Sequence, residues 1–248
     1  MSMNDGLANS GAALSRSTQS NAWVPLAQWF AVLTMTLEHV TKYVWPESAF
    51  VPWALAIGRI AFPVFAGMVA WHLLHNTRRP VRYGLRLLLI GAISQVPYAW
   101  VVTPDRLNIC FTLAFGLLAV VLLDQVKDRR TRMATGVVLF LLAAVVSPFV
   151  EYQILGLLLV PAFVYAFRNH QRVAAMLPAL ALCAVINGGS PLHMAISCAA
   201  GCAVLLAPSM SFEGAAVPAL PRGLRLSWYP LHLVAITVAI MAINQGAI

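Results

Sequence analysis

The sequence predicts an all-α protein, a polytopic membrane bundle of about nine transmembrane helices with a range of eight to ten. Three observations predict this class. Of the 248 residues, 60% are hydrophobic and 10% are charged, whereas a soluble domain has about 25% charged residues. The mean hydropathy is +0.80. The apolar residues form continuous runs instead of alternating with polar ones, which favours membrane helices over a membrane β-barrel.

Each apolar run is close to the length of a helix that crosses the hydrocarbon core, which is about 20 residues with a range of about 17 to 25. In chain order the runs lie near residues 24–44, 52–75, 82–102, 108–124, 133–149, 152–168, 173–187, 191–207 and 226–245. The seventh run is short, and residues 148–151 form either a turn or a kink between the fifth and sixth. These two places set the range of eight to ten.

Basic residues mark every second connection between the runs and predict the topology. Twelve of them lie there: Arg78, Arg79, Arg82 and Arg86 after the second run; Lys127, Arg129, Arg130 and Arg132 after the fourth; Arg168 and Arg172 after the sixth; Arg222 and Arg225 before the ninth. Lys42 and Arg106 fall on the opposite side. Because cytoplasmic loops are enriched in Lys and Arg, the N-terminus is predicted in the cytoplasm and, with nine spans, the C-terminus outside.

The same loops explain the net charge of +8, since topology and anionic lipid headgroups account for short basic loops. These segments are too short and too close to the membrane to predict a nucleic-acid partner. Residues 1–22 are polar and lack an apolar core, so we expect a disordered cytoplasmic tail and no signal peptide. Residues 23–248 are expected to form a single transmembrane domain, with the first run as an uncleaved anchor.

No metal site is predicted. The four cysteines all lie in apolar runs and form no CxxC pair, which is typical of small packing residues. His72 and His75 lie three residues apart at the cytoplasmic end of the second run. They are expected to meet water or headgroups, because no carboxylate completes a zinc-binding pattern around them.

Rare polar residues collect at one depth of the predicted bundle. Glu38, Arg59 and Gln95 each lie seven residues from the outer end of their run, about 10 Å below the boundary. Asn108 and Thr112 open the fourth run from the same side. Ionisable residues inside a membrane are rare, usually pair and mark functional sites. The alternative for Glu38 and Arg59 is an ion pair that only locks two helices together.

Two further signals accompany this layer. Pro63 removes the hydrogen bond that would use the Arg59 carbonyl, and Gly58 permits close approach of a neighbouring helix. In the last run Tyr229 and His232 lie on one helix face, and His232 is expected about 10 Å from the cytoplasmic side. A packing role for His232 is the alternative to a functional one.

Short motifs in this order resemble the TraX family of conjugative-pilin acetylases. They are "LEHV" in the first run, "GRIAFPVFAGMV" in the second, "RLLLIGAISQVPY" in the third, "NICFTLAFGLLAVVLLD" in the fourth and "YPLHL" in the last. The resemblance covers about residues 26–124 and resumes at 228. Glu38 stands where the family often has Asp; the Glu side chain is longer and carries the same charge. The resemblance implies an acyltransferase-like domain in the bacterial inner membrane, with acetyl-CoA as co-substrate, no bound cofactor and the N-terminal amine of a pilin subunit as acceptor.

For this implied chemistry the residues take the following roles. His39 is the candidate general base, because a neutral imidazole accepts a proton near pH 7. Glu38 is assigned to Arg59 or to the ammonium group of the substrate. Arg59, Asn108 or Thr112 is expected to donate a hydrogen bond to the oxyanion of the reacting thioester. His232 and Tyr229 are expected to line the route of the acetyl group into the site. The phosphates of acetyl-CoA are expected to contact Arg78, Arg79, Arg82 and Arg86 or the Lys127–Arg132 cluster.

Two other functions remain open on the residues alone. One is a proton-coupled transporter or flippase that uses Glu38, His39 and Arg59, although the runs hold no other deep carboxylate for a relay. The other is a non-catalytic assembly component of a conjugation machine, which would tolerate alanine at His39 and Arg59. The class of acceptor, whether protein, lipid or sugar, is also open.

Overall fold

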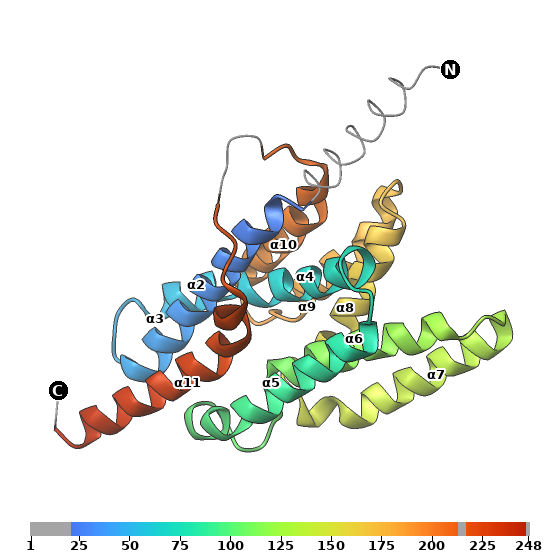
Figure 1. Cartoon of the computed structure of the whole chain (residues 1–248). Coiled ribbons are helices and arrows are strands. Elements are labelled where there is room, and N and C mark those ends of the chain that lie inside the picture. Colours follow the sequence, from blue (N-terminus) through green and yellow to red (C-terminus); the bar gives the residue numbers. More distant parts are fainter. Residues whose placement is uncertain (1–20, 213–216, 247–248) are drawn as a thin grey trace, which may run out of the picture.

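The computed structural model describes residues 21–212 and 217–246, and within them the chain is helical apart from turns, loops and one isolated β-bridge (Figure 1). The all-α prediction is therefore confirmed for this part of the chain. The predicted tail, residues 1–22, lies outside the described residues except for its last two positions.

The helices follow one another in a simple order along the chain. They are α2 (Trp23–Val44), α3 (Val51–Gly58), α4 (Ala61–His75), α5 (Pro80–Val101), α6 (Ile109–Gln125), α7 (Arg129–Val146), α8 (Gln153–Arg168), α9 (Leu177–Val185), α10 (Pro191–Leu206) and α11 (Arg222–Asn244), with short 3₁₀ turns η1 (Ser147–Phe149), η2 (Val173–Met176) and η3 (Ala207–Ser209).

Among the described residues, five helical units are long and apolar enough to cross a membrane. They are Val51–His75, Pro80–Val101, Arg129–Phe149, Pro191–Ser209 and Arg222–Asn244. Three further apolar helices are shorter. α2 has 22 residues, but polar side chains such as Gln28, Glu38 and His39 lower its hydropathy, and it is not among the five. The protein is a helical membrane protein, while nine crossings and a cytoplasmic N-terminus stay predictions.

The second predicted run is one span broken in the middle. α3 ends at Gly58, α4 begins at Ala61, and Arg59 and Ile60 form a turn between them. Pro63 has no N–H with which to bond the Arg59 carbonyl, so the regular helical ladder cannot continue through this point. The sequence predicted the missing hydrogen bond at the Arg59 carbonyl but one uninterrupted run; the structure shows a break there, which places Arg59 at the junction.

α4 forms the centre of the packing and contacts α2, α8 and α10. Its buried face includes the small residues Ala66, Gly67 and Ala70, which let neighbouring helices approach closely. A Cβ atom at Gly67 would collide with the side chain of Val204 in α10. By contrast, α7 lies at the edge of the bundle (Figure 1), and none of its described side chains is buried. We assign that helix to the lipid-facing surface.

Two connections at one end of the bundle are joined by backbone hydrogen bonds. The Leu107 N–H donates to the Phe149 carbonyl (2.7 Å), and the Glu151 N–H donates to the Leu107 carbonyl (3.2 Å). α8 then starts through two residues with left-handed backbones, Tyr152 at φ 57° and Gln153 at φ 50°. Such angles are unfavourable for residues other than glycine. The fold therefore holds a strained turn in place beside the end of α5 and the start of α6.

Candidate functional site

A cavity of about 820 Å³ lies at the end of the bundle where α2 and α5 end and α6 and α8 begin. Its walls come from α2, the α3–α4 junction, α5, the α5–α6 loop, the α7–α8 turn, the end of α9 and α11. The ionisable side chains that line it are Glu38, His39, Lys42, Tyr43, Arg59, Tyr98, Asp105, Arg106, Glu151, Tyr152 and Tyr229. Because the bundle is otherwise apolar, this concentration makes the cavity the candidate functional site.

Glu38 and Arg59, which the sequence placed at one depth, form an ion pair, so of the two partners considered for Glu38 the structure shows Arg59. The Arg59 Nε–H also donates to the Leu55 carbonyl (3.1 Å), and Nη1 lies at 3.5 Å from Asn187 Oδ1. The side chains of Arg59 and Glu38 are 18% and 11% exposed. The pair therefore joins α2 to the broken span and presents one face to the cavity.

Gly58 is the reason that α2 and α3 lie this close together. A Cβ atom at this position would collide with the carboxylate and the Cβ atom of Glu38. We expect Gly58→Ala to separate the two helices, weaken the Glu38–Arg59 pair and destabilise the protein by about 1–3 kcal/mol, the usual cost of overpacking. Thermal unfolding in detergent measures this. Gly223→Ala is the matched control, because nothing lies within 4 Å of a Cβ atom there, and equal unfolding midpoints for both variants would contradict the expectation.

His39 and His232 form a hydrogen-bonded pair between α2 and α11. His39 Nδ1 lies 2.9 Å from His232 Nε2, and His232 Nδ1 lies 3.0 Å from the Trp228 carbonyl oxygen. A carbonyl only accepts, so Nδ1 of His232 carries the hydrogen, and Nε2 of a neutral His232 is an acceptor. His39 Nδ1–H must then donate to it. This chain of bonds leaves Nε2 of a neutral His39 with an unprotonated lone pair.

The pairing corrects the depth expected for His232. The sequence placed it about 10 Å from the cytoplasmic side, away from His39, but the two rings stack with centroids 5.2 Å apart. The depth was counted from the nearest basic residues, whereas the helix register is fixed by contacts. The Trp228 indole donates to Thr36 Oγ1 (3.0 Å), which sets α11 against α2 one turn earlier. Tyr229 also lines the cavity, with its ring centroid 5.4 Å from that of His232.

Besides Glu38, two carboxylates line the cavity that the sequence reasoning missed, Asp105 in the exposed α5–α6 loop and Glu151. Loss of water raises the pKa of the Glu151 carboxyl, while the Tyr98 hydroxyl and the cations Lys42, Arg59 and Arg106 oppose the rise. The Tyr98 hydroxyl is close enough to Glu151 to interact with it but meets hydrogen-bond geometry with no described group. The only sequence signal for Glu151 was that residues 148–151 interrupt the apolar runs. This interruption predicted a turn or a kink, and no site residue was expected in it.

Asn108 and Thr112 support the site from behind and do not line the cavity. Asn108 is buried and caps α6, accepting from the Cys110 N–H (3.1 Å) while its amide donates to the Gly91 carbonyl (2.8 Å) and Gln95 Oε1 (2.9 Å). The Thr112 hydroxyl donates to the Glu151 carbonyl (3.0 Å). Their donors are thus already used, and we do not carry their expected oxyanion role forward.

The cationic residues expected to hold the phosphates of the donor lie at the other end of the bundle. Arg78, Arg79, Arg82 and Arg86 are exposed. In α5, Arg82 precedes Tyr98 by 16 residues, a distance of roughly 24 Å along a helix. The structure therefore does not bring these four residues to the cavity. At the same end, Arg168 forms a two-pronged ion pair with Asp124, with nitrogen–oxygen distances of 2.9 and 2.5 Å.

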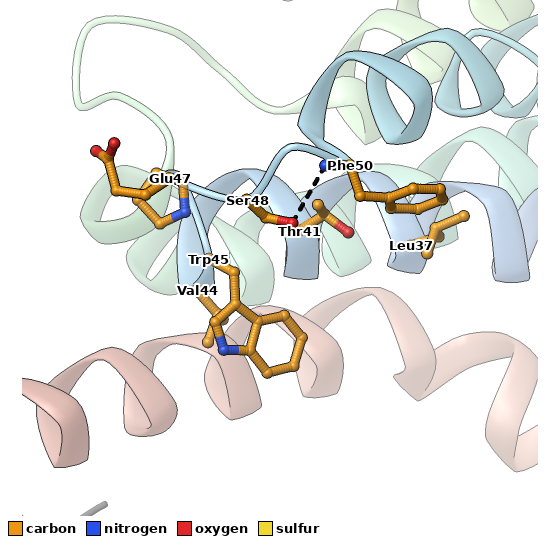
Figure 2. A pocket seen from close by; sticks show the side chains of 8 residues that line it. Leu37, Thr41, Val44, Trp45, Glu47, Ser48 and Phe50 are labelled. Atoms are coloured by element: carbon orange, nitrogen blue, oxygen red, sulfur yellow. Dashed lines mark hydrogen bonds between the residues drawn. The ribbon is translucent and has the colours of Figure 1, made fainter.

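A second hollow lies beside the end of α2 and the loop that follows it. Figure 2 shows Leu37, Trp45 and Phe50 around it, with the Phe50 N–H donating to Ser48 Oγ (3.2 Å). Trp45 and Phe50 are exposed, and the lining is mainly apolar. It brings together none of the ionisable residues predicted for the site, so the functional assignment stays with the larger cavity.

The fold and the cavity define a helical membrane protein with an ionisable site inside one end of its bundle. The model of the TraX family, described as "TraX protein", matches residues 25–240, and the chain belongs to this family. It is also similar to the "Probable fimbrial assembly protein FimC, serogroup H1" of Dichelobacter nodosus, with 25% identity over 167 residues, 61% of this chain and 66% of that protein. That match spans just under two thirds of the relative's length. No solved structure matches the chain.

Proposed function

We propose that the protein is an acyl-CoA-dependent N-acetyltransferase of the bacterial inner membrane. It transfers an acetyl group from acetyl-CoA to the N-terminal amine of a pilin subunit during maturation of a conjugative pilus. Membership of the TraX family and the similarity to a protein named for fimbrial assembly support the link to pili. The observation that carries the chemical step is the His39–His232 pair, which leaves a proton-accepting nitrogen in a cavity that also holds Arg59.

In the proposed reaction, the lone pair of the acceptor amine attacks the carbonyl carbon of the thioester. The amine proton passes to Nε2 of His39, so that a C–N bond forms without a positively charged product. The hydrogen bond from His39 Nδ1 to His232 Nε2 stabilises the resulting imidazolium and fixes the plane of its ring. When the C–S bond breaks, the imidazolium returns the proton to the departing thiolate, and the histidine is again neutral.

Negative charge develops on the carbonyl oxygen during the attack and requires a donor. Arg59 is the best placed cationic donor, because it lies in the cavity lining and its Nη1 group has only a long contact at 3.5 Å to Asn187. Glu38 neutralises the resting guanidinium and holds its plane. This assigns Glu38 a positioning role instead of contact with the acceptor.

The acetyl donor enters this scheme from the cytoplasmic side of the predicted topology. Its phosphates are proposed to contact the basic rim that includes Arg78, Arg79, Arg82 and Arg86, which is roughly 24 Å from the cavity along α5. The acyl end therefore has to pass between helices to reach His39. Tyr229 lines the cavity beside His232 and belongs to the end point of that route.

The test is transfer of labelled acetyl from acetyl-CoA by the purified protein in detergent. The acceptor is a peptide with the N-terminal sequence of the pilin from the same conjugation system, and its N-terminally blocked form is the control. Label in the free-amine peptide alone supports the proposal. Equal labelling of both peptides, or none above a reaction without protein, contradicts it.

A further inference from the structure

Two of the three carboxylates that line the cavity, Asp105 and Glu151, have no ion-pair partner within the described residues, and Asp105 is an exposed loop residue whose partner is the Thr103 hydroxyl. The two ion pairs found there are Arg59–Glu38 and Arg168–Asp124. The backbone of Glu151 is fully engaged, since its N–H donates to the Leu107 carbonyl and its own carbonyl accepts from the Thr112 hydroxyl. Its side chain lines the cavity. The fold therefore fixes the main chain of Glu151 and leaves its carboxylate accessible to a ligand in the cavity.

Tyr98 adds an independent sign that a ligand belongs beside Glu151. Tyr98 is 1% exposed and lines the same cavity; its hydroxyl interacts with the Glu151 carboxylate but meets full hydrogen-bond geometry with no group in the part of the chain that is described. Buried hydroxyl groups nearly always have a partner, because leaving one unpaired is unfavourable. A polar ligand group between Tyr98 and Glu151 would satisfy both side chains.

The backbone that follows Glu151 is strained. Tyr152 and Gln153 both have left-handed backbone angles, which persist only where the surroundings enforce them and which are found frequently at functional sites. The Tyr152 ring stacks on Phe62, with centroids 4.4 Å apart. Gly156 makes room for the turn, because a Cβ atom there would lie 2.7 Å from that of Tyr152.

The chemistry of these groups selects a cation with hydrogen-bond donors. A carboxylate accepts from an ammonium group and repels an anion. Aromatic side chains, Phe62, Tyr152 and Tyr229, also line the cavity. The cationic group of Arg59 is already neutralised by Glu38, and Lys42 lies over the Tyr43 ring at 4.7 Å from its centroid. Burial raises the pKa of the Glu151 carboxyl against the opposing charges of Lys42, Arg59 and Arg106, so an added cation beside it would stabilise its ionised form.

We propose that Glu151 and the Tyr98 hydroxyl form the subsite that binds the primary ammonium group of the acceptor. This inference rests on the proposed function, because it gives the acceptor of that reaction its recognition site. It also gives separate roles to Glu38 and Glu151. Glu38 positions Arg59, and Glu151 holds the acceptor as its ammonium form in the cavity with His39. The ammonium group loses one proton to solvent, and His39 accepts a second proton from the resulting amine during the attack.

The test measures binding without acetyl-CoA. The probes are a short apolar peptide with a free N-terminal amine and the same peptide with that amine replaced by hydrogen, titrated calorimetrically into the purified full-length protein in detergent. We expect the wild type to prefer the amine peptide, and Glu151→Gln to weaken binding of that peptide by about tenfold or more, as is typical of a hydrogen bond to a charged group. Binding of the peptide without the amine should not change.

Two further variants keep the result interpretable. Glu47→Gln removes an exposed carboxylate near the same end that does not line the cavity, and it should bind as the wild type does. Tyr98→Phe removes only the hydroxyl, and it should weaken binding of the amine peptide less than Glu151→Gln does. If Glu151→Gln and Tyr98→Phe both bind the amine peptide like the wild type, or if the wild type shows no preference for the amine, the subsite is wrong.

The outcome is separable from that of the proposed function. An amine preference that depends on Glu151, in a protein that transfers no acetyl group, would leave the subsite standing and reject the acetyltransferase. Acetyl transfer by the wild type, together with an amine preference that Glu151→Gln and Tyr98→Phe leave unchanged, would reject the subsite alone.

Discussion

His39→Ala is expected to reduce acetyl transfer by about 10²–10⁴-fold, the usual contribution of a general base, while the protein still inserts and purifies normally. The reason is that Nε2 of His39 is the unprotonated nitrogen at the end of the Trp228–His232–His39 chain of hydrogen bonds. The acetylated fraction of a co-expressed pilin, determined by mass spectrometry of its N-terminal peptide, measures the effect.

The matched control for this variant is His193→Ala. His193 lies in α10 outside the cavity lining, so the acetylated fraction should stay at the wild-type level. An unchanged fraction in His39→Ala would remove His39 from the mechanism and favour a non-catalytic assembly role. A fall in both variants that follows their yield would indicate a folding effect.

Arg59→Ala is expected to have the largest effect on stability, a loss of about 3–5 kcal/mol. It leaves Glu38 without its counter-charge in a pair whose side chains are only 18% and 11% exposed. The double variant Glu38→Gln/Arg59→Met removes both charges and should be less destabilised than Arg59→Ala alone. Chemical unfolding in detergent, followed by tryptophan fluorescence, measures the three free energies of unfolding.

Arg168→Ala provides the comparison for this prediction. It breaks an ion pair with Asp124 in which both side chains are 44% exposed, and such pairs contribute at most about 1 kcal/mol. Equal losses of unfolding free energy in Arg59→Ala and Arg168→Ala would contradict the buried character of the Glu38–Arg59 pair. A double variant as unstable as Arg59→Ala would show that packing, not charge, is responsible.

The helices and the Glu38–Arg59 pair were predictable because they depend on local information. The length of an apolar run identifies a membrane helix, and Pro63 identifies the missing hydrogen bond at the Arg59 carbonyl, although the break of the helix at that point was not predicted. Counting residues from the outer boundary then put Glu38 and Arg59 at one depth, and the collision expected of a Cβ atom at Gly58 explains their contact.

The contact of His232 with His39 was not predictable in the same way. Counting from the basic end of a helix assumes that each helix starts at the same membrane level. The register of α11 against α2 depends instead on particular contacts, such as the hydrogen bond from Trp228 to Thr36. Such contacts join residues almost two hundred positions apart, and no local pattern encodes them.

Glu151 was missed because it lies between two apolar runs, where a carboxylate is expected to meet water. The bridge between Leu107 and Val150 folds that connection back over the cavity, and the strained turn at Tyr152 directs it inward. Asn108 and Thr112 show the reverse case. Their depth was consistent with a catalytic role, but the sequence does not reveal their hydrogen-bond partners: Asn108 joins α6 to α5, and Thr112 supports the turn at Glu151.

A proton-coupled transporter remains the main rival to an enzyme. Asp105 and Glu151 add carboxylates to the cavity, but they lie at the same end of the bundle as Glu38 and do not extend a relay along the helices. A transporter would move its substrate in proteoliposomes without acyl-CoA. An acetyltransferase requires acetyl-CoA and is recognised by the covalent transfer of an acetyl group to the acceptor amine.

The central claim is that acetyl transfer takes place in the cavity formed by His39, Arg59 and Glu151. An experimental structure with a bisubstrate analogue, in which the acceptor amine is joined through an acetyl linker to CoA, tests it most directly. The claim predicts that the linker carbonyl lies within hydrogen-bond distance of Arg59 and that the nitrogen lies beside His39 Nε2. An analogue bound elsewhere, with this cavity empty, would contradict it.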